Sequence, residues 1–135
     1  MTTTAVIAGT PYYVLLDGNR RIGPRIVPLN SGIECLVVFG FSDKGPYDKF
    51  CMKSQLALTP YPLVKDYLRN PVGASGESLK LVVVDAPGPG EPCLYAATME
   101  AVLEAQEKRT SLVKAGYRLM LDLQAEAYRV EKSSV

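Results

Sequence analysis

The sequence contains no histidine and no tryptophan among its 135 residues. Histidine has the side-chain pKa closest to neutrality, and it is the usual general base, proton shuttle and metal ligand. Its absence excludes the Ser/His/Asp and Cys/His arrangements of nucleophilic catalysis, together with every zinc site that uses imidazole. The sequence therefore predicts a chain that is not an enzyme and that uses no metal or other cofactor.

A large excess of either charge is also missing. Fifteen lysines and arginines are balanced by 14 aspartates and glutamates, which leaves a formal net charge of +1. Proteins that bind duplex nucleic acid usually carry a clear basic excess, because phosphate neutralisation dominates their affinity. No run approaches the roughly 20 apolar residues that a membrane-spanning helix needs. We therefore expect neither nucleic acid nor a membrane among the partners of this chain.

Cysteine is scarce, with three residues and no Cys-x-x-Cys spacing. Cys35 lies in an apolar run, where cysteine usually serves as a small buried hydrophobe. An odd and unpatterned set fits a reducing compartment better than a secreted disulfide scaffold. Residues 1–9 lack the basic start and the long apolar stretch of a signal peptide. The expected location is the cytoplasm.

Length and patterning predict one domain over residues 1–135, in which residues 1–10 form a flexible leader. Pro11–Leu16 has the aromatic and β-branched content of a strand, and the turn signal Asp17-Gly18-Asn19 follows it. Residues 35–41 and 79–84 are apolar throughout or nearly so, which indicates buried strands. A short helix is expected after the capping pair Ser42-Asp43.

Residues 97–131 are expected to form a helical C-terminal segment. Thr98 can cap a helix with Glu100 in its first turn and Lys108 near its end, and this charge order complements the helix dipole. From Tyr117 onward, apolar residues alternate as in a strand, but the stretch is rich in strong helix formers and has no β-branched residue before Val130. We favour helix there. The predicted fold is α+β, a small mixed sheet of about four to five strands with helices packed on it.

The leading functional prediction is a non-enzymatic protein-interaction module that self-associates. An amphipathic C-terminal region would exceed what a small sheet can cover, so a protein partner or a second copy would bury the remainder. The apolar residues that approximate a contact seam are Met99, Val102, Leu103, Val113, Tyr117 and Met120.

The alternative prediction is a domain that binds a small ligand or an anion. Arg20, Arg21 and Arg25 flank the Asp17-Gly18 turn and can present guanidinium groups to a carboxylate or phosphate. Exposed arginines that discourage edge-to-edge strand pairing are the competing explanation. The Asp85–Pro92 loop, which begins with Asp85 after a buried strand, would complete the binding surface.

Several segments also carry a family resemblance: Tyr13–Leu16, Pro28-Leu29, Cys35–Phe39 followed by Ser42-Asp43 and a short helix, and Leu81–Asp85 with its following proline. In this pattern residues 11–92 resemble the N-terminal domain of SseB-like proteins. The hairpin from Asp17 to Arg25 and the C-terminal segment depart from that domain. The resemblance implies a small α/β module without an established catalytic site, so it assigns no functional residue.

Overall fold

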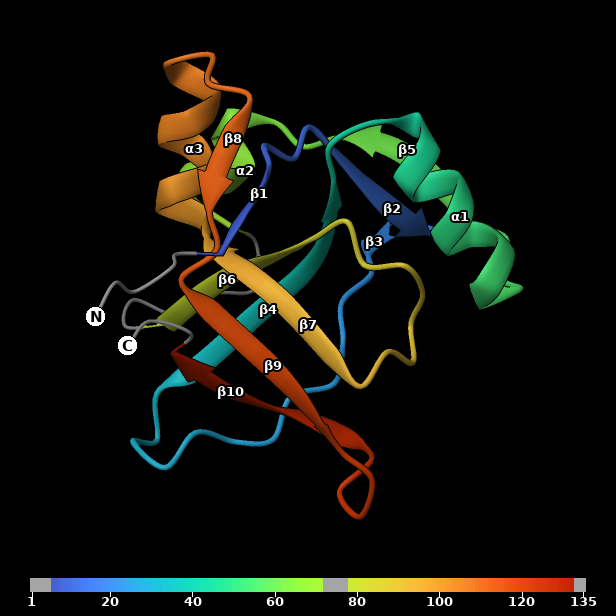
Figure 1. Ribbon diagram of the computed structural model, residues 1–135, viewed down its shortest axis with the longest axis vertical. Helices are drawn as coiled ribbons and strands as arrows, with labels where there is room; N and C mark the ends of the chain where they lie inside the picture. The colour runs from blue at the N-terminus through green and yellow to red at the C-terminus, as the bar shows by residue number, and fades with distance from the viewer. Residues whose placement is uncertain (1–5, 72–77, 133–135) are drawn as a thin grey trace.

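The computed structural model describes residues 6–71 and 78–132 (Figure 1). Within these ranges the chain forms ten strands and three helices. The strands are β1 (Ile7–Gly9), β2 (Tyr13–Asp17), β3 (Arg20–Arg21), β4 (Glu34–Phe41), β5 (Thr59–Pro62), β6 (Ser78–Val84), β7 (Cys93–Thr98), β8 (Leu112–Lys114), β9 (Tyr117–Asp122) and β10 (Ala127–Lys132). The helices are α1 (Lys44–Ser54), α2 (Lys65–Arg69) and α3 (Met99–Glu107).

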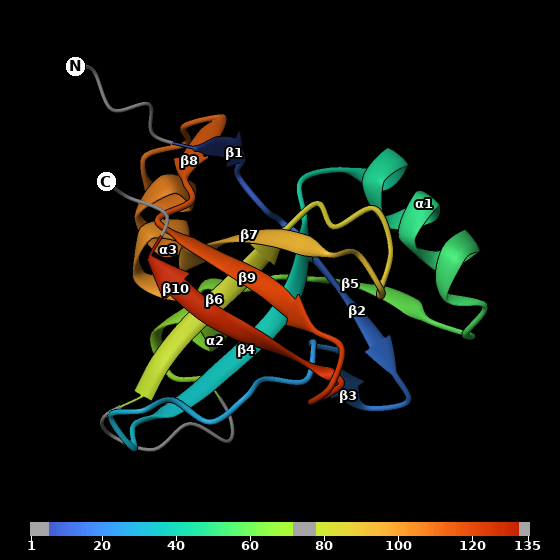
Figure 2. The same cartoon turned by 60° about the horizontal axis from the view of Figure 1, so that its bottom comes forward.

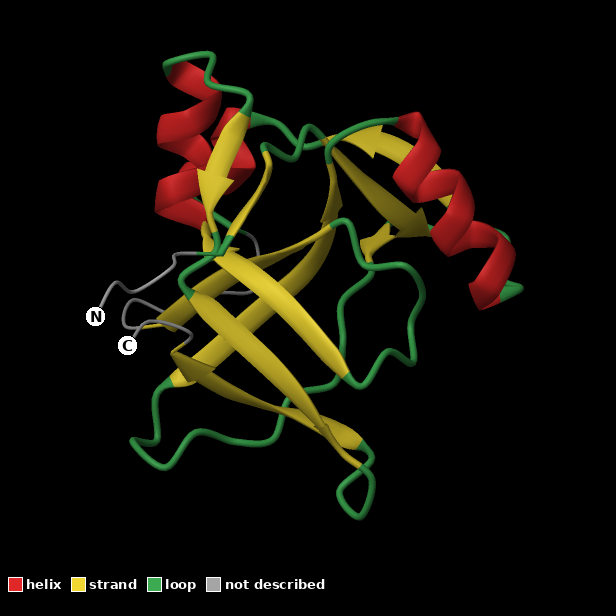
Figure 3. Ribbon diagram, viewed as in Figure 1, coloured by secondary structure: helices red, strands yellow, loops and turns green. Residues whose placement is uncertain are grey.

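The prediction of a small sheet of four to five strands with a helical C-terminus is wrong. One sheet contains eight strands in the order β10-β9-β7-β6-β4-β2-β3, with β5 paired to β2. The expected helical segment 97–131 is helix only over α3 and continues as β8, β9 and β10 (Figure 3). Strand pairing decides this region, because β9 lies between β7 and β10 and the alternating Leu119 is fully buried.

The predicted flexible leader is also wrong over residues 7–10. β1 pairs with β8 in a separate two-stranded sheet. Thr10 is 2% exposed, and its hydroxyl donates to the Thr110 carbonyl oxygen at 2.8 Å. Residues 1–5 of the expected leader lie outside the described residues.

Both faces of the central strands are buried, which explains the two apolar runs in the sequence. β4 and β6 run parallel, with Val37 opposite Leu81 and Val38 opposite Val82. Val38 and Val82 belong to a core cluster covered by α2, α3 and β8, whereas Val37 and Leu81 belong to a second cluster on the opposite face, which α1 covers through Phe50. The two buried strands predicted from the sequence are confirmed.

The segment between β3 and β4 closes the sheet around the second core cluster (Figure 2). Phe39 of β4 donates its N–H to the Ile22 carbonyl oxygen at 3.0 Å. Tyr128 of β10 donates to the Arg25 carbonyl oxygen at 2.8 Å and accepts from the Val27 N–H at 2.9 Å. Backbone hydrogen bonds therefore connect β10 back to β4 through residues 22–27.

β5 lies at an edge of the sheet, where its Thr-Pro-Tyr-Pro sequence opposes further pairing. The Leu63 N–H donates to the Tyr12 carbonyl oxygen at 2.8 Å, and in the same register Tyr61 lies opposite Val14. The backbone nitrogens of Pro60 and Pro62 therefore point away from β2, toward the open side of the edge. Because proline has no N–H, this edge lacks the donors that a ladder with another chain would require.

Candidate functional site

The three arginines of the predicted anion site have different surroundings in the structure. The guanidinium carbon of Arg21 lies 3.9 Å from the ring centroid of Tyr67 and 6.0 Å from that of Tyr61, which is cation–π geometry. Burial raises the pKa of the Tyr67 hydroxyl, and the neighbouring Arg21 charge opposes this shift. Arg20 lies opposite Asp17 in the β2–β3 pair, and Arg25 contributes its backbone to the bond with Tyr128.

Asp85 has a different partner, at the carboxyl ends of the parallel strands β4 and β6. Its two carboxylate oxygens accept from the backbone N–H of Ser42 at 2.7 Å and from the Ser42 hydroxyl at 2.6 Å. Asp85 adopts a left-handed backbone conformation with φ of 52°, and its own N–H donates to Gly40 at 2.9 Å. Figure 2 shows β3 well apart from this end of β6. Asp85 and Arg21 are therefore not brought together into one anion site.

The predicted contact seam is divided between the interior and the surface. Met99, Val102 and Val113 are at most 5% exposed within the first core cluster. Side chains this well covered by their own chain cannot contact a second copy. Leu103 packs at the margin of the same cluster, and Tyr117 packs against the second cluster. Met120 is 38% exposed, because alternation along β9 turns it to the face opposite Tyr117.

Met120 belongs to a part of the sheet that the helices do not cover. Figure 1 shows α3 and the β1–β8 pair gathered at one end of the strands, while β9 and β10 extend beyond them. The register aligns Tyr95 with Arg118 and Cys93 with Met120 across β7 and β9. We call this surface the outer face, and its residues are Cys93, Tyr95, Arg118, Met120, Asp122, Arg129 and Glu131.

The outer face combines an apolar centre with two ion pairs. Tyr95 is 39% exposed and Met120 is 38% exposed. Arg118 Nε lies 2.8 Å from Glu131 Oε1, and this pairing raises the pKa of the arginine. Arg129 Nε lies 2.8 Å from Asp122 Oδ2. The pKa of Asp122 is lowered, first by the backbone N–H of Ala125 and then by Arg129.

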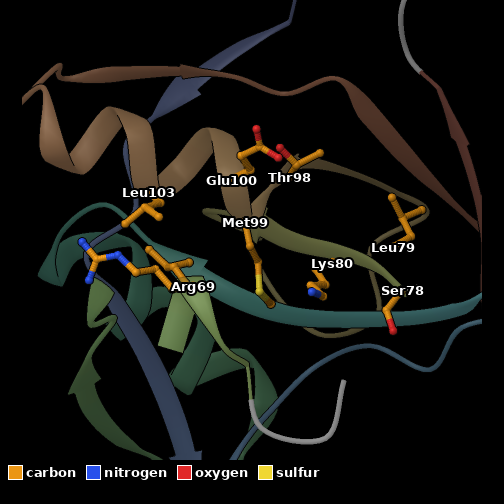
Figure 4. Close-up of a pocket in the computed structure, with 9 residues that line it drawn as sticks. Arg69, Ser78, Leu79, Lys80, Thr98, Met99, Glu100 and Leu103 are labelled. Carbon is orange, nitrogen blue, oxygen red and sulfur yellow. The ribbon is translucent and has the colours of Figure 1, made fainter. Parts of the chain in front are cut away.

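A second surface feature is a cavity of about 460 Å³ between α2, β6 and the start of α3 (Figure 4). Leu68, Met99 and Leu103 line it together with the charged residues Arg69 and Lys80. Lys80 was not among the residues predicted to bind, although it is the single charge within the apolar run 79–84. Tyr95 and Arg118 were not predicted either, because their alignment depends on β9 being a strand.

The thiols show little of the chemistry of reactive cysteines. All three cysteines are free. Burial raises the pKa of Cys35 to about 11, and burial followed by the Asp48 charge raises that of Cys51. A raised pKa keeps the nucleophilic thiolate scarce near neutral pH. In the described part of the chain, no group of three His, Cys, Asp or Glu residues is placed to hold a metal ion.

No helix among the described residues is both long enough and apolar enough to cross a membrane. No family model, no curated protein and no solved structure matches this chain significantly.

Proposed function

We propose that this chain is a protein-interaction module whose outer face binds a second copy of itself. The observation that carries the proposal is the arrangement of charges along β9. Arg118 and Asp122 lie two residues to either side of Met120, so alternation directs all three side chains to the outer face. Their charges have opposite signs at equal distances from the exposed methionine.

This arrangement is self-complementary under two-fold symmetry. An axis that crosses β9 at Met120 runs the two copies of β9 antiparallel, and it places Arg118 of one copy opposite Asp122 of the other. Met120 and Tyr95 then form an apolar centre between the sheets. Parallel stacking would instead oppose like charges. The geometry therefore favours antiparallel face-to-face association.

The charge balance of the outer face supports a second copy as the partner. Arg118 and Arg129 are matched by Asp122 and Glu131, so the face offers no net attraction to a strongly charged partner. Pairing at the β5 edge is a poor route to association, since Pro60 and Pro62 occupy its outward positions.

A matched pair of exposed residues tests this proposal. Met120→Glu places the glutamates of the two copies opposite each other at the proposed two-fold axis, and this like-charge contact should weaken self-association about tenfold or more, which corresponds to roughly 1.4 kcal/mol. Leu123→Glu introduces the same charge in the β9–β10 turn, where the side chain is 80% exposed, and should leave association unchanged. Light scattering after size exclusion, over a range of protein concentrations, measures both effects.

Either of two results would contradict the proposal. The first is a wild-type chain that stays monomeric at every concentration. The second is equal self-association of the two glutamate variants. Circular dichroism of each variant establishes that its fold is intact, so that a change in mass can be attributed to the contact surface.

We further infer that the module acts in the cytoplasm and without catalysis or a cofactor. Three free thiols support a reducing compartment, and the absence of histidine supports a role that needs no proton relay. Membership of residues 11–92 in an SseB-like N-terminal domain remains a proposal, supported by the strand pattern of the sequence.

A further inference from the structure

The cavity between α2, β6 and α3 contains a lysine that has no counter-charge among residues 6–71 and 78–132. Lys80 lies on β6, and alternation directs its side chain to the same face as Val82, beneath α2 and α3. The residue is half-buried, and it forms no hydrogen bond or ion pair with any residue that the structure describes. Partial burial of an ammonium group costs free energy, and a bound anion would offset that cost.

The other charged residues of the cavity do not neutralise the charge of Lys80. Arg69 is held by Glu107 at 3.0 Å and by Asp66 at 3.3 Å, so its charge is already compensated. Glu100 lies in the first turn of α3 and is exposed. Figure 4 shows its carboxylate directed toward Thr98 and away from Lys80. A ligand at Lys80 would therefore meet a positive centre.

The remaining wall of the cavity is partly apolar, and Ser78 and Thr98 contribute polar atoms beside the apolar side chains. Leu68 and Met99 are 4% and 1% exposed, and Leu103 of α3 lines the same space. Figure 4 shows Met99 and Leu103 on the α3 side and Lys80 on the β6 side. A volume of about 460 Å³ is within the range of small-molecule sites. The cavity thus joins one cationic position to a partly apolar wall, in which Leu79 and Leu103 are the partly exposed apolar residues.

We propose that this cavity binds an amphipathic organic anion. Its carboxylate or phosphate head would pair with Lys80, and its apolar body would lie against the partly exposed side chains of Leu79 and Leu103. This site is separate from the outer face, whose residues come from β7, β9 and β10. The two proposals can therefore fail independently.

The fluorescent probe 8-anilinonaphthalene-1-sulfonate tests the proposal, because it combines an anionic head with an apolar aromatic body. The wild-type chain should bind it saturably at one site. Lys80→Gln should weaken binding about tenfold or more, since it removes the charge-assisted contact. Lys114→Gln removes an exposed charge on β8, outside the cavity, and should leave binding unchanged.

An uncharged analogue separates the charge from the apolar contribution. N-Phenyl-1-naphthylamine lacks the sulfonate, so its binding should be equal in the wild type and in Lys80→Gln. Leu103→Glu is a second variant, at a partly exposed position, and should weaken binding of both compounds. Met120→Glu should bind the anionic probe as the wild type does, which distinguishes this site from the outer face.

Competition identifies the head group that the cavity prefers. Displacement of the probe by octanoate, by octyl phosphate or by both supports the proposal. The proposal is overturned if the wild type shows no saturable binding, if Lys80→Gln and Lys114→Gln bind the probe equally, or if neither competitor displaces it.

Discussion

Gly23 is the position at which one methyl group should disrupt the closure of the sheet. It lies in the segment that crosses from β3 toward β10, against the backbone of β4. A Cβ at this position would overlap the Val37 carbonyl oxygen and lie 3.0 Å from the carbonyl carbon. Both groups belong to backbone, so neither can move aside as the end of a flexible side chain would. Gly23→Ala must therefore displace the crossing segment.

The hydrogen bonds of the crossing segment set the size of the effect. Three backbone bonds depend on its position: Phe39 to Ile22 at 3.0 Å, Tyr128 to Arg25 at 2.8 Å and Val27 to Tyr128 at 2.9 Å. At about 1 kcal/mol each, their loss would cost about 3 kcal/mol. The reduced freedom of alanine in the unfolded chain returns about 0.4–1 kcal/mol. We expect a net loss of about 2 kcal/mol in the free energy of unfolding.

Urea denaturation of Gly23→Ala beside Gly45→Ala provides the measurement. Gly45 lies in α1, has no neighbouring atom within 4 Å of a Cβ and does not have a positive φ. Alanine there should stabilise the chain by up to about 1 kcal/mol. Hydrogen exchange at the Tyr128 amide should accelerate only in the Gly23 variant. If both variants unfold within about 0.5 kcal/mol of each other, a difference too small for the loss of one hydrogen bond, the proposed role of the crossing segment is refuted.

Two further predictions concern buried polar groups. Gln106 is 5% exposed, and its Nε2 donates to the carbonyl oxygens of Pro11 at 3.0 Å and Leu63 at 3.1 Å. Gln106→Met leaves both acceptors unsatisfied, so it should lower the free energy of unfolding, measured by thermal unfolding, by about 2–4 kcal/mol. A loss below about 0.5 kcal/mol would contradict this role, because one such bond alone is worth that much. The folded-state pKa of Cys35, raised from 9.0 to about 11, means that its contribution to stability is complete below pH 9 and is lost as the pH rises toward 11. Cys35→Val should reduce the loss of stability between these pH values in urea titrations, and an unchanged pH profile would count against burial of the thiol.

Local signals in the sequence predicted the elements that short segments specify for themselves. The apolar runs of β4 and β6 require burial on both faces, whatever the strand order. Asp43 caps α1 by accepting from the Lys44 N–H at 2.8 Å, and Thr98 caps α3 by accepting from the Ala101 N–H at 3.0 Å. In these cases the residues that interact are neighbours along the chain, so their pattern is visible without a fold.

The C-terminal region depended instead on partners far away along the chain. Residues 117–122 contain good helix formers, but pairing with β7 on one side and β10 on the other satisfies their backbone as a strand. Because residues 117–122 form a strand, the side chains of Met120 and Arg118 lie on the outer face. The predicted seam spans both kinds of segment: Met99 and Val102 lie on α3 and pack into the chain's own core, whereas Met120 lies on β9 and is exposed.

Composition and short-range pattern were enough to exclude imidazole chemistry and to predict the central buried strands and two helix caps. Tertiary structure alone aligned Tyr95 with Arg118, placed Lys80 beside α2 and α3 with no counter-charge among the described residues, and connected residues 25–27 to Tyr128. The reason is physical: a side chain's chemistry and a local backbone preference belong to the residue itself, whereas exposure and charge pairing depend on which distant segments pack against it.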